Sequence, residues 1–158
     1  MPCFWHRCFS VTLLITSFSA QKKEIVCITQ QLLDSISCKD YAIYSKLCDT
    51  GMTCFEPESM GNLIEGMDFH KFYFDNNASN RTPKIHTTML NPSVHMLGDD
   101  GACIAYIRLT QYIDRNGEAR SRQSEETRVW QKQSGRGWVC VHVHRTGAPS
   151  LVNTASRD

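Results

Sequence analysis

Apolar residues along the first half of the chain recur with the period of a helix. Over residues 22–36 they fall at intervals of three and four, which predicts an amphipathic helix. Asp40 is a suitable N-cap for a second helix that runs to Leu47. The other elements predicted here are a turn at 49–51, a short strand at 52–55, a helical stretch at 58–74 that Gly61 and Gly66 interrupt, and a loop rich in Asn and Ser at 76–83.

Beyond residue 83 the pattern changes from helical to extended. The predicted strands are 86–97, broken at Asn91-Pro92, then 102–113, 125–132 and 138–145, with turns at 98–101, 114–117 and 134–137. The Asn116-Gly117 pair suits a hairpin turn because both residues accept positive φ. Helices first and an antiparallel meander afterwards predict an α+β domain, with the helices on one face of a strongly curved sheet.

The strand at 102–113 is apolar on both faces. One face carries Cys103, Ala105, Ile107 and Leu109, and the other carries Ile104 and Tyr106. A sheet with one face in water would alternate more cleanly, so both faces are expected to be covered. The helices are expected to cover one face of the strand. A neighbouring subunit is the simplest candidate to cover the other face, and a long loop or a ligand is the alternative.

Composition narrows the class of protein. The chain has 158 residues, enough for one ordinary domain, and its 41% hydrophobic and 21% charged content is typical of a folded protein. The net charge is +1 and there is no block of like charges, so neither nucleic acid nor an anionic membrane is an expected partner. No apolar run approaches the ~20 residues that a transmembrane helix needs.

The first twenty residues differ from the rest. An apolar stretch over 9–18 is followed by small residues at Ser17 and Ser19, the separation that signal-peptidase cleavage requires. The segment is either such a secretory signal, an unstructured leader, or an upstream exon read in place of the true one. We therefore divide the chain into a leader at 1–20, a domain at 21–150 and a flexible tail at 151–158.

The eight cysteines leave the compartment open. No pair has C-x-x-C spacing, and no His lies at a zinc-like offset from a Cys pair. Cys103 and Cys140 lie in apolar strands, where a free thiol packs as a small hydrophobe, and this favours reduced thiols in the cytoplasm. The alternative is a secreted, disulfide-bonded glycoprotein with sequons at Asn77 and Asn80.

Several blocks of sequence resemble, in order, the association domain of calcium/calmodulin-dependent protein kinase II. The likeness extends over about residues 22–150. Its blocks are FEPE at 55–58, GNLIEGMDFH at 61–70, FYF at 72–74, ACIAYIRLTQY at 102–112, SEETRVW at 124–130 and VHVHR at 141–145.

The resemblance implies a cone-like fold similar to nuclear transport factor 2, with a long N-terminal helix packed on a strongly bent antiparallel sheet. It also implies a homo-oligomer in which dimers close into two stacked rings. In the family this hub holds kinase domains at a local concentration of order mM, so that neighbours phosphorylate one another. Co-assembly with full-length kinase subunits is a further expectation.

Kinase activity and cofactors are not expected in this chain. There is no Gly-x-Gly-x-x-Gly or His-Arg-Asp motif, and His144-Arg145-Thr146 and Asp68-Phe69-His70 each differ from a kinase motif in the third residue. The chain is either a free-standing hub or an incomplete gene model. The alternative function is a small-molecule (carboxylate) binding protein or enzyme of the same cone-like fold, of which ketosteroid isomerase is an example.

Three arginines, Arg108, Arg128 and Arg145, occupy three successive predicted strands on apolar faces, where a lone guanidinium would be very costly to bury. One interpretation pairs them with internal carboxylates such as Glu56, Glu58 or Glu65. The other has them converge on an anion pocket with His70 and Tyr44 at its rim. The resemblance favours the pocket, because matching residues in the family line a positively charged pocket that accepts small carboxylates or an acidic peptide segment.

His142 and His144 lie two apart and project from one face of a strand. Metal ligation is conceivable, but no third ligand lies at a convincing offset, so packing or hydrogen bonding at a subunit contact is expected. Glu125 and Glu126 are adjacent and point to opposite faces, which prevents them from forming a carboxylate pair.

Overall fold

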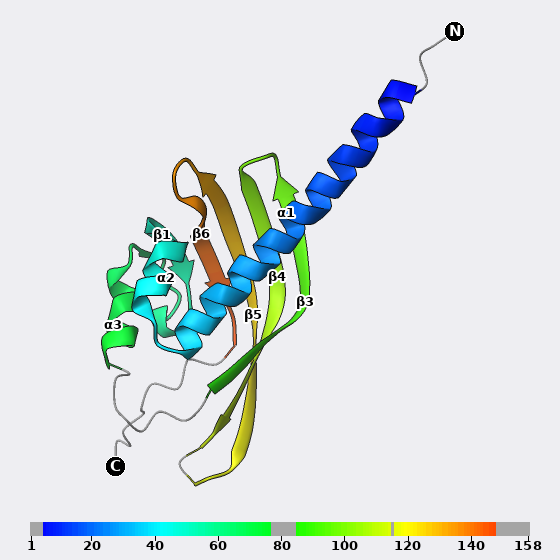
Figure 1. Cartoon of the computed structure of the whole chain (residues 1–158). Coiled ribbons are helices and arrows are strands. Elements are labelled where there is room, and N and C mark those ends of the chain that lie inside the picture. Colours follow the sequence, from blue (N-terminus) through cyan, green and yellow to red (C-terminus); the bar gives the residue numbers. More distant parts are fainter. Residues whose placement is uncertain (1–4, 77–84, 115, 148–158) are drawn as a thin grey trace.

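The computed structural model describes the backbone of residues 5–76, 85–114 and 116–147, with side chains from Ser19 onward. All three helices precede the four consecutive strands of the second half of the chain, as the change of period predicts, and two short strands between α2 and α3 complete a six-stranded sheet (Figure 1). The elements are α1 (Trp5–Ser37), α2 (Tyr41–Leu47), β1 (Cys48–Phe55), a 3-10 turn (Pro57–Ser59), β2 (Ile64–Glu65), α3 (Asp68–Asn76), β3 (Ile85–Leu97), β4 (Gly101–Ile113), β5 (Ala119–Gln133) and β6 (Gly137–Arg145).

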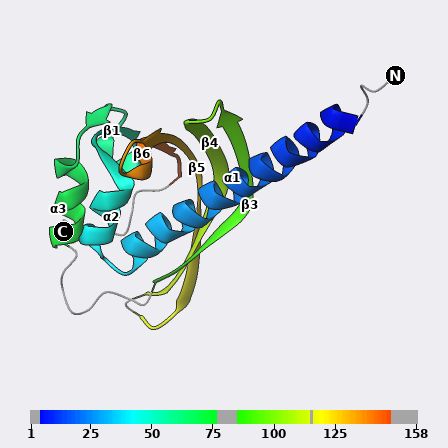
Figure 2. The ribbon, with the colours of Figure 1, turned by 45° about the horizontal axis from the view of Figure 1, so that its top comes forward.

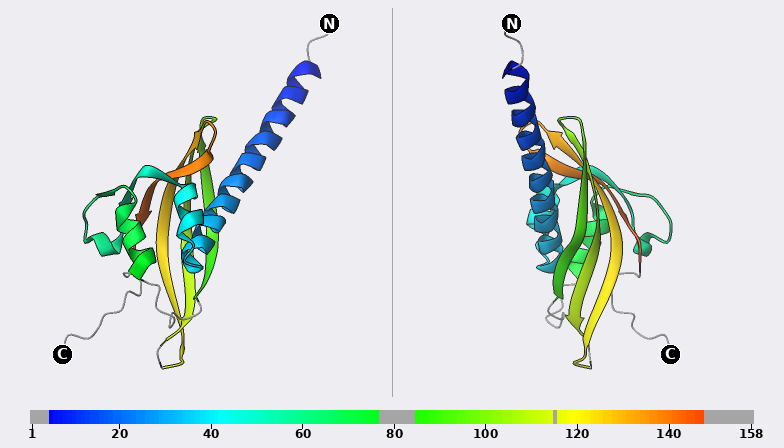
Figure 3. Two further views of the ribbon diagram at one scale, coloured as in Figure 1. Left: turned by 60° about the vertical axis from the view of Figure 1, so that its left-hand side comes forward. Right: turned by 90° about the vertical axis from the view of Figure 1, so that its right-hand side faces the viewer.

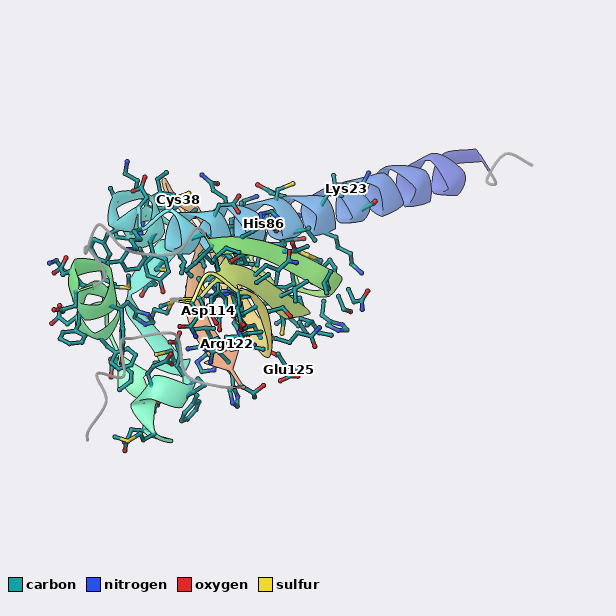
Figure 4. The ribbon with its side chains drawn as sticks, turned by 90° about the horizontal axis from the view of Figure 1, so that it is seen from below. Lys23, Cys38, His86, Asp114, Arg122 and Glu125 are labelled. Carbon is teal, nitrogen blue, oxygen red and sulfur yellow. The ribbon has the colours of Figure 1, made fainter. Side chains whose placement is uncertain are left out.

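Helix α1 is longer than the predicted helix. Ile25, Leu32 and Leu33 are fully buried against the sheet, and the Ser37 and Thr87 hydroxyls are 2.9 Å apart where the helix meets β3. Figure 4 shows α1 lying along the sheet between Lys23 and Cys38, and the part before Lys23 continues beyond it. The helix begins at Trp5, so the alternative of an unstructured leader is wrong for residues 5–20.

The second helix is confirmed. Asp40 caps α2, and its side chain accepts a hydrogen bond from the Ile43 backbone N–H at 2.9 Å. The predicted turn at 49–51 is instead an irregular part of β1, where the register with β6 shifts between Cys48 and Thr53. Over this shift β1 advances five positions while β6 advances two, and extra residues in one strand bend that strand without ending it.

The predicted helical stretch at 58–74 is wrong over its first half. Residues 57–59 form a 3-10 turn and 64–65 a short strand, and only Asp68–Asn76 is helical. Gly61 and Gly66 both have φ of +85°, which an α-helix does not allow, and Met60 has φ of 51°. The two glycines therefore prevent an α-helix from forming before Asp68.

The sheet has the strand order β2-β1-β6-β5-β4-β3. Every neighbouring pair is antiparallel except β1 and β6, which are parallel and are separated in the chain by α3 and four strands. The predicted break in β3 is confirmed, since the register shifts between Leu90 and Ser93 and Asn91 has φ of 51°. These bulges bend the sheet toward α1 (Figure 2).

The two faces of the sheet differ in burial. The inner face, toward the helices, holds the core, in which Ile104, Trp130 and Val143 are less than 2% exposed. No described helix lies over the outer side of β3, β4 and β5 (Figure 3). On that side the β4 residues Cys103, Ala105, Ile107 and Leu109 are only partly buried within this chain.

Six cysteines, at 27, 38, 48, 54, 103 and 140, have described side chains, and all six are free thiols. No helix in the described part of the chain is long and apolar enough to cross a membrane. The two sequons, most of the predicted loop at 76–83 and the predicted tail at 151–158 lie outside the described residues, and Asn76 is the last residue of α3.

Candidate functional site

A buried network of charged and polar side chains lies on the inner face of β4 and β5. Glu126 is at its centre, with its side chain fully buried. One carboxylate oxygen accepts hydrogen bonds from the Tyr106 hydroxyl at 2.5 Å and from Arg128 at 3.1 Å, and the other accepts from Arg108 at 3.3 Å. Arg128 also donates to the Tyr106 hydroxyl at 2.9 Å. Two guanidinium groups thus share one carboxylate.

The register of the sheet produces this convergence. Tyr106 lies directly opposite Glu126, and Ile104 lies opposite Arg128, so their side chains share one face. Ser124, Glu126, Arg128 and Trp130 alternate as buried residues along β5.

Arg145 forms a second ion-paired group at the end of β6. Its guanidinium donates to Glu58 and, at 3.4 Å, to Glu56, and its side chain is 7% exposed. Glu56 and Glu58 come from the segment that follows β1, which the parallel pairing of β1 with β6 brings alongside Arg145. Burial raises the pKa of Glu56, and the neighbouring Glu58 charge adds to this while Arg145 opposes it.

Tyr44 and His70 form a third buried pair, between α2 and α3. The Tyr44 hydroxyl lies 3.1 Å from Nδ1 of His70. Burial, followed by the positive charge of Arg128, lowers the pKa of His70 from 6.5 to about 4, so the imidazole is neutral at physiological pH. Its Nε2 atom is buried and has no hydrogen-bond partner among the described residues. The Nε atom of Arg108 is also buried without a hydrogen-bond partner among the described residues.

The charge state of the network follows from its geometry. Burial by itself would raise the pKa of Glu126, but Arg128 and Arg108, with the Tyr106 hydrogen bond, outweigh burial and lower it to about 2. Glu126 is therefore ionised and held between two cations, which makes it a poor general base near neutral pH.

The five predicted pocket residues all lie on the inner side of the fold. The charge of Arg128 acts on both Tyr44 and His70. Arg108 forms an ion pair with Glu126, and Arg145 forms one with Glu58. The pairing of Arg145 with Glu56 and Glu58 agrees with the carboxylate interpretation, whereas Glu65 is exposed on β2.

Sequence reasoning missed Glu126 and Tyr106. The signal was present, because Glu126 is two residues from Arg128 and must share its face in a strand.

On the outer face His142 and His144 are held by packing. Nδ1 of His142 is 2.8 Å from the Thr53 hydroxyl, and the Phe55 ring lies 6.2 Å from the His142 ring and 5.6 Å from the His144 ring. Burial and the neighbouring His144 lower the pKa of His142 below 6.5. Among the described residues no group of three or more His, Cys, Asp or Glu side chains could hold a metal ion.

Residues 21–149 match the family model described as calcium/calmodulin dependent protein kinase II association domain. This chain belongs to that family. The chain is 63% identical over 141 residues to calcium/calmodulin-dependent protein kinase type II of Caenorhabditis elegans. That alignment covers 89% of this chain and 19% of the relative, so the chain spans about a fifth of the relative's length.

Solved structures agree with the family. The association domain of C. elegans CaMKII is 65% identical to this association domain with a TM-score of 0.77, and the match covers 82% of this chain and 98% of that one. A nuclear transport factor 2-like protein from Salmonella enterica is 21% identical with a TM-score of 0.69, covering 88% of this chain and 99% of that one. The second likeness shows the fold alone, and together they confirm the predicted cone-like α+β fold.

Proposed function

We propose that this association domain joins kinase II-type subunits into a closed multimer, in which dimers of the domain form two stacked rings. Family membership and the partly buried outer face of the sheet support the proposal. The outer face is the observation that carries it, since an isolated chain leaves an apolar sheet surface in contact with water.

The register defines the residues of that face. Because directly paired residues on neighbouring strands share a face, Leu90 of β3 lies beside Ile107 of β4, and Cys103 of β4 lies beside Val129 of β5. Small side chains at Ala105 and Cys103 allow a second sheet to approach closely. A second copy of this chain is the occupant that we propose, because an isologous contact buries the same face on both partners.

The multimer would raise the local concentration of whatever the subunits carry. Tethering converts an encounter between kinase domains into an intramolecular event at concentrations of order mM. We propose that this chain also co-assembles with full-length kinase subunits, since subunits that share this face would use the same contact.

The mass of the full 158-residue chain in solution tests the assembly. Size exclusion with light scattering at neutral pH is expected to give a closed species of about ten subunits or more. A stable monomer, or a simple dimer at all concentrations, would contradict it. Mixing with a full-length kinase II and isolating mixed multimers tests co-assembly separately.

We also propose that the inner site binds a small carboxylate. The unpartnered Nε2 of His70 and Nε of Arg108 support this, because a buried donor without a partner costs about 1–3 kcal/mol that a ligand oxygen would recover. Succinate is expected to raise the melting temperature, while succinamide, its uncharged analogue, leaves it unchanged. Arg108→Gln should remove the effect, and Arg120→Gln, on the exposed β4–β5 hairpin, should retain it. Equal responses to succinate and succinamide would contradict carboxylate binding.

The free thiols support a reducing compartment, and we propose the cytoplasm. Titration of the denatured natural protein without reductant should find every thiol reactive. Loss of thiols in pairs would favour the secreted alternative.

A further inference from the structure

Histidines collect on the outer face of the sheet. Four of the five with described side chains, His86, His95, His142 and His144, lie there by register, and only His70 faces inward. His95 is paired with Cys103, Cys103 with Val129, and Val129 with His142, so one cross-strand row carries a histidine near each end. His144 lies in the next row, opposite Thr127.

We infer that His142 and His144 make the contact between two copies of this chain dependent on pH, so that acidification from pH 7.5 to 5.5 loosens the multimer. The inference rests on the proposed function, because it requires the outer face to be covered by a second copy. His142 is partly buried within one chain already, and covering the face removes both imidazoles further from water.

Burial favours the neutral form of an imidazole, because desolvation penalises its charged form. The pKa of His142 is already below its ordinary value of 6.5, first because of burial and then because of the nearby His144. A histidine whose pKa is lower in the assembled state than in the free protomer binds its proton more readily after dissociation. Assembly is then fully supported above the free-state pKa and is progressively lost as the pH falls below it.

Few acidic groups on this face can offset the added charge. Along the described paired strands, the outer-face carboxylates are Glu65, paired with Thr53, and Glu125, whose side chain accepts from the Thr146 hydroxyl. That hydrogen bond lowers the pKa of Glu125, which stays ionised through the relevant range. Phe55 lies against both imidazole rings, and neither Thr53 nor Phe55 titrates. An isologous contact brings the same histidines from both copies, so each protonation adds like charge to both sides.

The hydrogen bond between His142 and Thr53 can persist when His142 is protonated. Nδ1 can accept from the hydroxyl when neutral and donate to it when protonated, so the imidazole keeps its position in both states. The effect is therefore one of charge and desolvation. Each histidine that titrates between the two states contributes at most about a tenfold change in the equilibrium between pH 7.5 and 5.5.

Subunit exchange measures this directly. Two pools of the full chain, labelled at the N-terminus with a donor or an acceptor fluorophore, are mixed and energy transfer is followed at pH 7.5 and 5.5. Exchange of the unaltered chain is expected to be about tenfold faster at pH 5.5, because an isologous contact carries both histidines twice. The double variant His142→Asn/His144→Asn should show no acceleration, because Asn keeps a group near Nδ1 for Thr53 but does not titrate.

His86→Asn is the matched control. It lies on the same face but eight positions farther along β4 than the His142 row, about 26 Å away, and should accelerate as the unaltered chain does. Circular dichroism at both pH values confirms that each variant is folded, and His142→Asn alone, with a smaller acceleration, serves if the double variant is not.

Three outcomes overturn the inference. Equal exchange rates at both pH values, or undiminished acceleration in the folded histidine variants, would overturn it and leave the multimer intact as a proposal. A chain that is monomeric at pH 7.5 would overturn both.

Discussion

Glu126 shows how one buried charge orders several neighbours. Its carboxylate is fully buried, yet it accepts from Tyr106, Arg108 and Arg128, and these contacts hold its pKa at about 2. Removing one partner of a buried ion pair usually costs more than forming the pair contributes, because the remaining charge has no water to replace it. Arg128, with a side chain 2% exposed, would be left in that position.

Glu126→Gln is expected to lower the free energy of unfolding by about 3 kcal/mol at pH 7. Gln preserves the volume and one acceptor but not the charge between the two arginines. Denaturant unfolding at one fixed protein concentration measures the loss, since unfolding of a multimer depends on concentration. Glu118→Gln, exposed at the β4–β5 hairpin, is the control and should change stability by about 0.5 kcal/mol or less.

The pH dependence of that difference has a definite sign. Glu126 has a pKa lowered from 4.5 to about 2, so its stabilising effect is complete above 4.5 and is lost as the pH falls toward 2. The advantage of the unaltered chain over Glu126→Gln should shrink over this range. A difference that stays constant down to pH 3 would contradict the ion-pair explanation.

At the scale of elements, α1 provides most of the helical surface that the sheet covers. Leu32 and Leu33 are fully buried, and Thr29 and Ser35 bury their hydroxyls by donating to the Ile25 and Leu32 carbonyls at 2.7 Å. The apolar spacing predicted this helix correctly between 22 and 36. The predicted helix at 58–74 was wrong over its first half. Its apolar residues fit a helical period, but the chain returns there to pair with β1, and Gly61 and Gly66 adopt positive φ.

Leu32→Ala should reduce the free energy of unfolding by about 2–5 kcal/mol, since it leaves a cavity between α1 and the sheet. Gln31→Ala, on the exposed side of the same helix, is the matched control and should have little effect because Ala is a good helix former. Thermal and denaturant unfolding of the two variants give the comparison. Similar losses in both would mean that helix propensity, not packing, decides the stability of α1.

At the scale of the whole molecule, the sheet separates two environments. Its inner face encloses the core and the ion-paired network, and its outer face is the surface that we propose for a second copy. The strand at 102–113 has apolar residues on both faces, and this pattern predicted that both faces of the sheet would be covered. The residues that would contact the partner are those on β4 that the chain itself only partly buries.

Leu109→Asp should dissociate the multimer while the fold is retained. A buried carboxylate without a partner is costly, and an isologous contact would bury two of them. Light scattering is expected to show a much smaller species, with the circular dichroism spectrum unchanged. Leu109→Met is the control and should assemble normally, because it keeps an apolar side chain of similar volume. An intact multimer in the Asp variant would place the contact elsewhere.

The sequence by itself determined the helix-then-strand order, the inward position of the arginines and the family. These depend on local period, on strand parity and on blocks of residues, all of which are properties of short segments. Tertiary structure decided the parallel pairing of β1 with β6, which places Glu56 and Glu58 beside Arg145. It also decided that Glu126 serves both Arg108 and Arg128. Partners far apart in the chain meet only after the sheet has bent and its register is fixed, and no local pattern encodes that register completely.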